Sequence, residues 1–369
     1  MAAAVGDGVP DAASSRKLVV LLDGTWSRAA TDTNVERLYR LIAPRSAAGA
    51  RQLCAYLPGV GVKPGLAHLL GGAFGLGLAD LVKQGYRWLA SNWQPGDEVW
   101  LFGFSRGAYA VRSLSGLVHH CGLLKRDAGG QVTRKMVAAA YKFYQRNLAY
   151  ADPQAVAFRA QHSIAIPIHF IGVWETVGAL GIPAVGAWFP YARKRYAFHD
   201  TALSANVRNA CQALALDEHR AAFKPTRWTR VPPGDATLRV EQRWFVGAHS
   251  DVGGGELTDG AGHRPDTLSD ITLAWMQAKA VATGLAFTTA FVPAPGAELD
   301  TPNPSWKTFM YGLYKLFSPR FDRVLGGGVN ETIDPSVWMK WYTTPGYRPA
   351  SLQVALDAGL IENGSGSVA

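Results

Sequence analysis

The sequence predicts an α/β domain in which a mainly parallel central sheet is flanked by helices. Short, almost continuously apolar runs alternate along the chain with stretches of helical spacing, and this alternation is typical of βαβ units. Such apolar runs suit strands that are buried on both faces, as in a parallel sheet. The 369 residues are 48% hydrophobic and 18% charged, which is enough apolar material for a large core.

In the N-terminal third of the chain, the residue pattern predicts a strand, a helix, a loop and a second helix. Residues 17–22 (KLVVLL) form the strand, which ends at residues 23–25 (DGT). Helical spacing over residues 34–42, with capping side chains just before it, predicts the first helix. The glycine-rich stretch 71–77 predicts a flexible loop or a close-packed turn, because it lacks the glycine spacing of a nucleotide site. An apolar helix is expected over residues 78–93.

The middle of the chain continues the same alternation. Strands are predicted over residues 98–103, 164–174 and 238–246, and helices over residues 108–119 and from residue 268 onwards. Asp217 and Glu218 are expected in a further helix, where solvation or ion pairing explains them better than chemistry.

The composition changes near the C-terminus, where proline and aromatic residues become frequent and strands are hard to recognise. We therefore expect an α/β domain over residues 17–290 and an aromatic-rich extension, residues 291–363, packed on it. Residues 1–16 are expected to be a disordered tail and residues 364–369 a loose one.

The charge balance narrows the choice of partners. Lysine and arginine outnumber aspartate and glutamate by 37 to 28, for a formal net charge of +9. This balance favours an anionic partner such as a phospholipid surface, although a merely soluble basic protein has it too. No block of five or six consecutive basic residues appears, so nucleic acid is not an expected partner. The oligomeric state is left open.

Cysteine usage and hydropathy indicate the compartment. Three cysteines, an odd and small number, argue against a disulfide framework, and they lack metal-ligand spacing. No signal peptide and no long apolar run is visible, so we expect a cytoplasmic protein or export by a specialised signal-less route. No cofactor and no metal is expected.

The strongest chemical signal is Gly103-Phe104-Ser105-Arg106-Gly107, a Gly-x-Ser-x-Gly pattern between a predicted strand and a predicted helix. In α/β-hydrolases this pattern places a nucleophilic serine on a tight turn, and small neighbours are needed where strand and helix meet. The helix N-terminus behind the serine favours developing negative charge. The context favours Ser105 as a nucleophile over a purely structural turn.

An acid and a histidine follow in the chain order that an α/β-hydrolase requires. Glu175 comes directly after the strand predicted to end at residue 174, and His249 lies in a glycine-rich loop after residue 246. We expect His249 to take the Ser105 proton and Glu175 to orient the imidazole. The alternatives are an ion-paired loop residue for Glu175 and a surface residue for His249.

The remaining candidate residues support this arrangement. The Arg106 amide is expected to be one oxyanion donor, and the loop of Gly24 and Thr25 the source of the other. Asp23 is expected to fix that loop through side-chain hydrogen bonds. The Arg106 side chain is expected either to pair with Asp23 or to contact an anionic head group. Asp251 is expected to stabilise the His249 loop; binding a cation or replacing the triad acid are alternatives.

These motifs together resemble the catalytic domain of the type VI secretion phospholipase effectors of the Tle type, first catalogued as an uncharacterised α/β-hydrolase domain. The resemblance runs from about residue 17 to 290 through LDGTW (22–26), PGVG (58–61), LFGFSRGAY (101–109), GVWETVG (172–178), ALALDE (213–218), WFVGAHSDVGGG (244–255) and LSD (268–270). It implies an α/β-hydrolase fold, cleavage of glycerophospholipid acyl esters, and a triad of Ser105, Glu175 and His249. The family usually has aspartate where this chain has Glu175, one methylene longer.

The sequence therefore predicts a serine esterase or lipase acting on acyl esters, most of all those of glycerophospholipids, through an acyl-enzyme. A soluble carboxylesterase or acyltransferase, and a non-catalytic module that binds a lipid or a partner, are the alternatives. Residues 305–317 mix aromatics with lysines and predict either a peripheral membrane contact or aromatic packing on the core. Residues 188–191 offer a similar choice between a lid and a loop closure.

Overall fold

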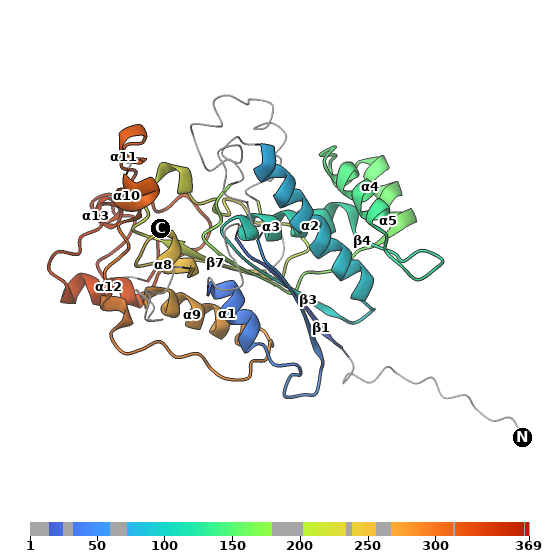
Figure 1. Cartoon of the computed structure of the whole chain (residues 1–369), viewed down its shortest axis with the longest axis horizontal. Helices are drawn as coiled ribbons and strands as arrows, with labels where there is room; N and C mark the ends of the chain where they lie inside the picture. Colours follow the sequence, from blue (N-terminus) through green and yellow to red (C-terminus); the bar gives the residue numbers. More distant parts are fainter. Residues whose placement is uncertain are drawn as a thin grey trace, which may run out of the picture.

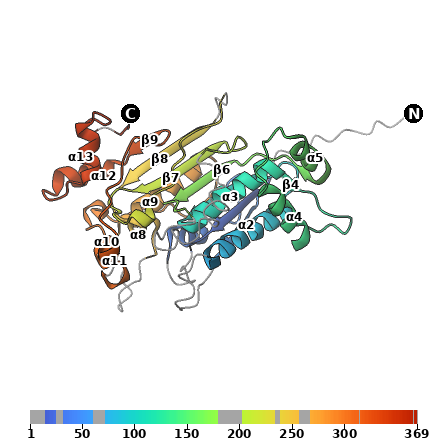
Figure 2. The same ribbon diagram turned by 90° about the horizontal axis from the view of Figure 1, so that it is seen from above.

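A seven-stranded sheet with only parallel strand pairs runs through the molecule in the order β2-β1-β3-β6-β7-β8-β9 (Figures 1 and 2). The computed structural model describes residues 15–24, 32–59, 72–178, 202–233, 238–255, 267–312, 314–364 and 366–368. The strands are β1 (Lys17–Leu22), β2 (Gln52–Leu57), β3 (Glu98–Phe104), β6 (Phe170–Trp174), β7 (Asn209–Ala215), β8 (Arg239–Phe245) and β9 (Glu331–Ile333). The predicted α/β architecture with a parallel central sheet is confirmed.

Helices cover both faces of this sheet, as Figure 1 shows. On one face lie α2 (Gly72–Asn92) and α3 (Arg106–Cys121), and on the other α1 (Asn34–Leu41) and α9 (Leu268–Ala282). The residues of β1 alternate between the two resulting cores: Val20 packs with the α2 and α3 side, and Val19 with the α1 and α9 side. Because both faces are covered, the strand is apolar from Leu18 to Leu22, which explains why the sequence predicted it.

Several predicted elements have the expected places. The strands predicted over residues 17–22, 98–103 and 238–246 and the helices over residues 34–42 and 108–119 and from residue 268 correspond to β1, β3, β8, α1, α3 and α9. The strand predicted over residues 164–174 is shorter: β6 covers its second half, and Ile164 belongs to a separate pair of β5 (Ser163–Ile164) with β4 (Leu123–Leu124). Pro167 interrupts the run, since proline offers no amide to a sheet.

Other predictions were wrong. The glycine-rich stretch 71–77 is not a loop over its described part, because α2 already begins at Gly72. The later turns of α2 bury Val82 and Leu89 in the core beside α3, and this packing outweighs the cost of glycine in a helix. Asp217 and Glu218 do not lie in a helix but directly after β7, whose alanines gave a misleading pattern.

The C-terminal segment does more than cover the core. It contributes β9 to the sheet edge, and α12 (Pro335–Thr343) and α13 (Ala350–Asp357) form a third apolar cluster with Trp244 of β8. Figure 2 shows these helices beside β9. Three further short helices, α10 (Ser305–Thr308), η5 (Phe309–Gly312) and α11 (Tyr314–Phe317), precede β9 in the chain. The division of the chain at residue 290 stays a prediction.

The two predicted tails differ from expectation where they are described. The Ile333 amide donates to the Gly366 carbonyl at 3.0 Å and the Val368 amide to the Glu331 carbonyl at 3.2 Å, so this terminus pairs with the open edge of β9. At the other end, Arg16 forms an ion pair with Asp97 at 2.6 Å, and residues 1–14 lie outside the described part. Within the described residues, no helix combines the length and apolar character that crossing a bilayer requires.

Candidate active site

Ser105 occupies the sharp turn between β3 and α3. Its backbone has φ 57° and ψ −117°, a conformation that a residue with a side chain rarely adopts. The turn is held from the neighbouring strand, because the Ser105 amide donates to the Trp174 carbonyl at 3.0 Å. A strained backbone at the carboxyl end of a central strand projects the hydroxyl out of the sheet, as the motif predicts.

The two glycines of the motif are required by close backbone approach. A β carbon on Gly103 would lie 2.6 Å from the Gly107 carbonyl oxygen, and one on Gly107 would lie 2.6 Å from the Leu22 carbonyl carbon. Both distances are shorter than real contacts of this kind, and backbone atoms cannot move away as a flexible side chain can. Gly107 therefore lets the start of α3 lie directly against the end of β1.

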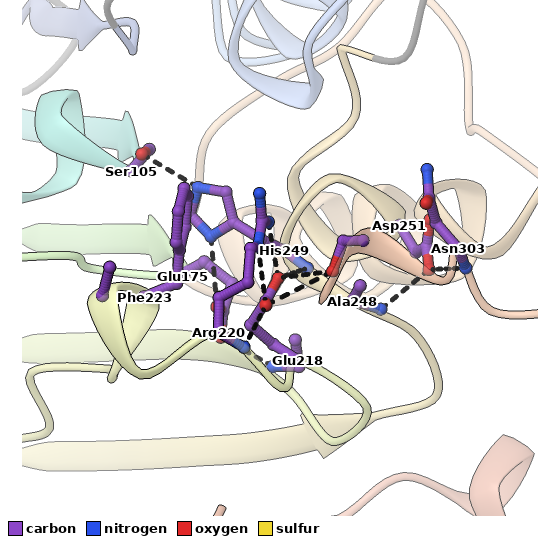
Figure 3. A network of polar contacts seen from close by, with 12 residues as sticks. Ser105, Glu175, Glu218, Arg220, Phe223, Ala248, His249, Asp251 and Asn303 are labelled. Atoms are coloured by element: carbon purple, nitrogen blue, oxygen red, sulfur yellow. Dashed lines mark hydrogen bonds and ion pairs between the residues drawn. The ribbon is translucent and has the colours of Figure 1, made fainter. Parts of the chain in front are cut away.

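His249 reaches Ser105 from the segment that follows β8. It begins the short helix α8 (His249–Gly253), and its Nε2 lies 2.9 Å from the Ser105 Oγ (Figure 3). The imidazole packs between Phe104 and Phe223, with ring centroids 4.7 and 5.0 Å away. These rings exclude water from the histidine and restrict its rotation.

Glu175 completes the line of polar contacts. It follows β6 with a left-handed φ of 46°, its side chain is fully buried, and its Oε2 lies 3.2 Å from the His249 Nδ1. Its Oε1 accepts a hydrogen bond from the Ala215 amide at 2.7 Å. The Glu175 carboxylate thus lies within hydrogen-bonding distance of the histidine.

The environment shifts the pKa values of both partners downward. Burial lowers the pKa of His249, and the neighbouring Glu175 carboxylate offsets this only in part. Burial alone raises the pKa of Glu175, but the Arg323 guanidinium and the histidine outweigh it, so the net shift is downward. The site therefore favours a neutral imidazole beside an ionised carboxylate, the protonation states that a general base and its orienting acid need.

A second group of polar residues, Glu218 and Arg220, contacts the backbone and surroundings of His249 and was not predicted from the sequence as part of the site. The buried Glu218 carboxylate accepts from the Arg220 side chain at 2.6 and 2.8 Å and from the His249 amide at 3.2 Å (Figure 3). Burial raises the pKa of Glu218, but Arg220 outweighs this and brings it to about 2. The Arg220 guanidinium stacks 3.6 Å from the Phe223 ring centroid. The adjacent Glu-x-Arg pair was the available sequence signal.

Arg323 was also missed. It comes from the C-terminal segment, 148 residues after Glu175, and its guanidinium donates to both oxygens of that carboxylate at 2.8 and 2.7 Å. No local pattern in the sequence could have indicated this contact.

Asp23 and Gly24, the described part of the predicted oxyanion loop, follow β1, and the Asp23 backbone lies against Gly107 at the start of α3. The Asp23 carboxylate accepts from the Gly24 amide at 2.7 Å, from the Thr33 hydroxyl at 2.6 Å and from the Tyr56 hydroxyl at 2.7 Å. Asp23 thus ties the end of β1 to Thr33, which caps α1, and to Tyr56 of β2. Because the Gly24 amide already donates to Asp23, its expected role as an oxyanion donor is not supported, and Thr25 lies outside the described residues.

Arg106 and Asp251 complete the set of predicted residues. Arg106 begins α3 directly after Ser105, and burial lowers the pKa of its side chain to about 10. The Asp251 carboxylate accepts from the Ala248 amide at 2.7 Å and from the Asn303 amide at 2.8 Å, which ties the start of α8 to the C-terminal segment. In the described part of the chain, no cluster of three or more metal-ligating side chains occurs.

A parallel sheet between helical layers, with a strained serine after one strand and an acid and a histidine after later ones, defines an α/β-hydrolase-like protein. Residues 16–279 match the family described as "T6SS, Phospholipase effector Tle1-like, catalytic domain". The chain belongs to this family, and the resemblance predicted from its motifs is confirmed.

Individual relatives are more distant. Over 245 residues the chain is 28% identical to the uncharacterized protein YEL023C of Saccharomyces cerevisiae, covering 59% of this chain and 33% of the yeast protein. An uncharacterized protein from Pseudomonas aeruginosa has a TM-score of 0.43 at 18% identity, over 82% of this chain and 50% of that one. A Thermogutta terrifontis esterase with bound butyrate has a TM-score of 0.36 at 14% identity, over 75% of this chain and 87% of the esterase. The chain thus spans a third to a half of the first two proteins.

Proposed function

We propose that this protein is a serine esterase or lipase that cleaves acyl esters through an acyl-enzyme intermediate. The observation that carries the proposal is the 2.9 Å contact between the Ser105 Oγ and the His249 Nε2, on a turn strained in the way a nucleophile requires. Membership of a family of phospholipase catalytic domains supports the same conclusion.

The first half of the proposed reaction forms the acyl-enzyme. The Ser105 Oγ attacks the ester carbonyl carbon while His249 Nε2 takes the hydroxyl proton. The imidazolium then carries a positive charge 3.2 Å from the Glu175 carboxylate, which stabilises it. When the tetrahedral intermediate collapses, the carbon–oxygen bond to the alcohol breaks and His249 returns the proton to the departing oxygen.

The second half repeats these steps with water. His249 takes a proton from a water molecule, whose oxygen attacks the acyl carbon, and the bond to Ser105 breaks as the proton returns to Oγ. The products are a carboxylic acid and the free enzyme.

The oxyanion of both tetrahedral intermediates needs backbone donors. We assign one of these roles to the Arg106 amide, which follows the nucleophile at the start of α3 and benefits from the helix dipole. For the second donor we keep the other predicted residue, Thr25, in place of Gly24.

A phospholipid is the substrate class we favour. The family description and the net charge of +9 both support an anionic lipid surface. In the segment of residues 305–317, Leu316 is 74% exposed, and Lys307 and Lys315 are also exposed. Phe309 instead packs inward on Phe223. We propose that this segment rests on the membrane through Leu316 and the lysines, while its inner face supports the site.

The test compares phospholipid vesicles with soluble esters of increasing acyl length. We expect turnover that rises sharply when substrate forms micelles or vesicles, and Leu316→Ser to weaken vesicle binding without changing hydrolysis of a short soluble ester. Equal rates on dispersed and aggregated substrate favour the soluble carboxylesterase. Transfer of the acyl group to an added alcohol favours an acyltransferase, and absence of any turnover favours a binding module.

A further inference from the structure

We infer that Arg323 is a positioning residue for the triad: it holds the Glu175 carboxylate in the orientation from which Glu175 serves His249. This inference rests on the function proposed above and extends it to a residue that lies beyond the segment matching the family, which ends at residue 279.

The geometry at Glu175 leaves its carboxylate no freedom of rotation. Oε1 accepts from the Ala215 amide at 2.7 Å and from Arg323 Nη1 at 2.8 Å. Oε2 accepts from Arg323 Nη2 at 2.7 Å and faces the His249 Nδ1 at 3.2 Å. A bidentate guanidinium fixes the plane of a carboxylate as well as its place. These contacts restrict rotation about the additional side-chain bond that glutamate has and aspartate lacks.

Arg323 is itself held rigidly. It is 2% exposed, and its Nη2 also donates to the Phe223 carbonyl at 2.9 Å. Phe223 lies in the short helix η3 (Ala221–Phe223), and its ring packs against the His249 imidazole. One guanidinium therefore positions both the acid and an aromatic wall of the histidine.

The charges around Glu175 and His249 make the positioning role of Arg323 measurable through the pH dependence of activity. The charged groups that act on the imidazole are Glu175, Glu218 and Arg220, while Arg323 pairs with both oxygens of the Glu175 carboxylate. A cation there opposes uptake of a proton by the Glu175–His249 pair. Removing it allows the pair to bind a proton at higher pH, wherever within the pair that proton resides.

The experiment measures kcat, KM and the pH profile of ester hydrolysis for the full chain and its variants. Arg323→Met is expected to lower kcat about 100-fold with little change in KM, because the acid is misplaced. It should also move the acid limb of the profile upward by about one pH unit. Arg323→Lys keeps the charge without the bidentate geometry and should lower kcat about tenfold while leaving the limb in place. Arg320→Met, on an exposed arginine of the same segment, is the control.

The action through Glu175 is tested in the Glu175→Gln background. There, Arg323→Met should have almost no further effect on kcat. This double variant removes both buried charges together, so the comparison with Glu175→Gln holds even if Arg323→Met alone does not fold.

The inference is overturned if Arg323→Met leaves both kcat and the acid limb of the pH profile unchanged. It is also overturned if Arg323→Met lowers kcat by the same factor in the parent and in the Glu175→Gln background. If the parent protein neither turns over esters nor reacts with a fluorophosphonate, the proposed function itself fails. If the parent is active and only the variants depart from expectation, the positioning role alone is wrong.

Discussion

Gly107 and Leu22 are backbone neighbours across the junction of α3 and β1: a β carbon on Gly107 would lie 2.6 Å from the Leu22 carbonyl carbon. This contact brings the serine turn and the loop of Asp23 together at one edge of the sheet. It gives the second glycine of the motif a physical reason that does not depend on chemistry.

The first prediction follows from that contact. Gly107→Ala should destabilise the protein by at least about 1–3 kcal/mol and abolish activity, because neither backbone can retreat. Urea unfolding and ester hydrolysis measure the two effects. Gly346→Ala is the control, since a β carbon there meets nothing within 4 Å. A Gly107→Ala variant with parental stability and turnover contradicts the account of the turn.

The second prediction concerns the length of the triad acid. Glu175→Asp withdraws the carboxylate by about one carbon–carbon bond from the histidine and the arginine that it now contacts. We expect kcat to fall about 10- to 100-fold, although aspartate is usual in the family. Steady-state kinetics beside Glu362→Asp, on an exposed glutamate, provide the measurement. Unchanged or improved turnover shows that the longer side chain has no positional role.

The third prediction concerns pH. Catalysis by His249 requires the neutral imidazole, so activity is present above the pKa of this group and lost as the pH falls through it. Because burial lowers that pKa from its ordinary value of 6.5, the acid limb of kcat/KM should have its midpoint below pH 6.5. Circular dichroism over the same range separates titration from unfolding. A midpoint above the ordinary value contradicts the proposed environment of the histidine.

The fourth prediction concerns Asp217, which receives the Gly247 amide and the Tyr347 hydroxyl at 2.7 and 3.0 Å. Burial raises the pKa of this carboxyl from 3.8 to about 6. The folded state then binds its proton more tightly than the unfolded chain, so the contribution of this group to stability is full below the unfolded pKa. It is lost as the pH rises through about 6.

Asp217→Asn cannot ionise and should remove this dependence. Relative to the parent, its free energy of unfolding should increase between pH 4 and pH 7 by up to about 3 kcal/mol. Urea titrations at both values test this, with the exposed Asp357→Asn as the control. A difference that does not vary with pH shows that folding leaves the pKa of Asp217 unchanged.

The sequence was informative where a structural demand is local. Two-sided burial makes β1 and β3 continuously apolar after their first residues, Lys17 and Glu98, and the tight turn at Ser105 demands small residues at fixed offsets. It was uninformative where partners are distant. The alanines of β7 have no strand-like pattern, and their place is set by pairing with β6 and β8. Arg323 meets Glu175 only through the fold, because no short-range spacing encodes a contact across 148 residues.

The central claim, that Ser105 is an activated nucleophile, is tested most directly by reacting the protein with a fluorophosphonate and mapping the modified residue by mass spectrometry. We predict stoichiometric modification of Ser105, fast in the parent, strongly slowed in His249→Ala, and absent in Ser105→Ala. Ester turnover should follow the same order. Modification elsewhere, or an unmodified parent protein that is correctly folded, would contradict the assignment.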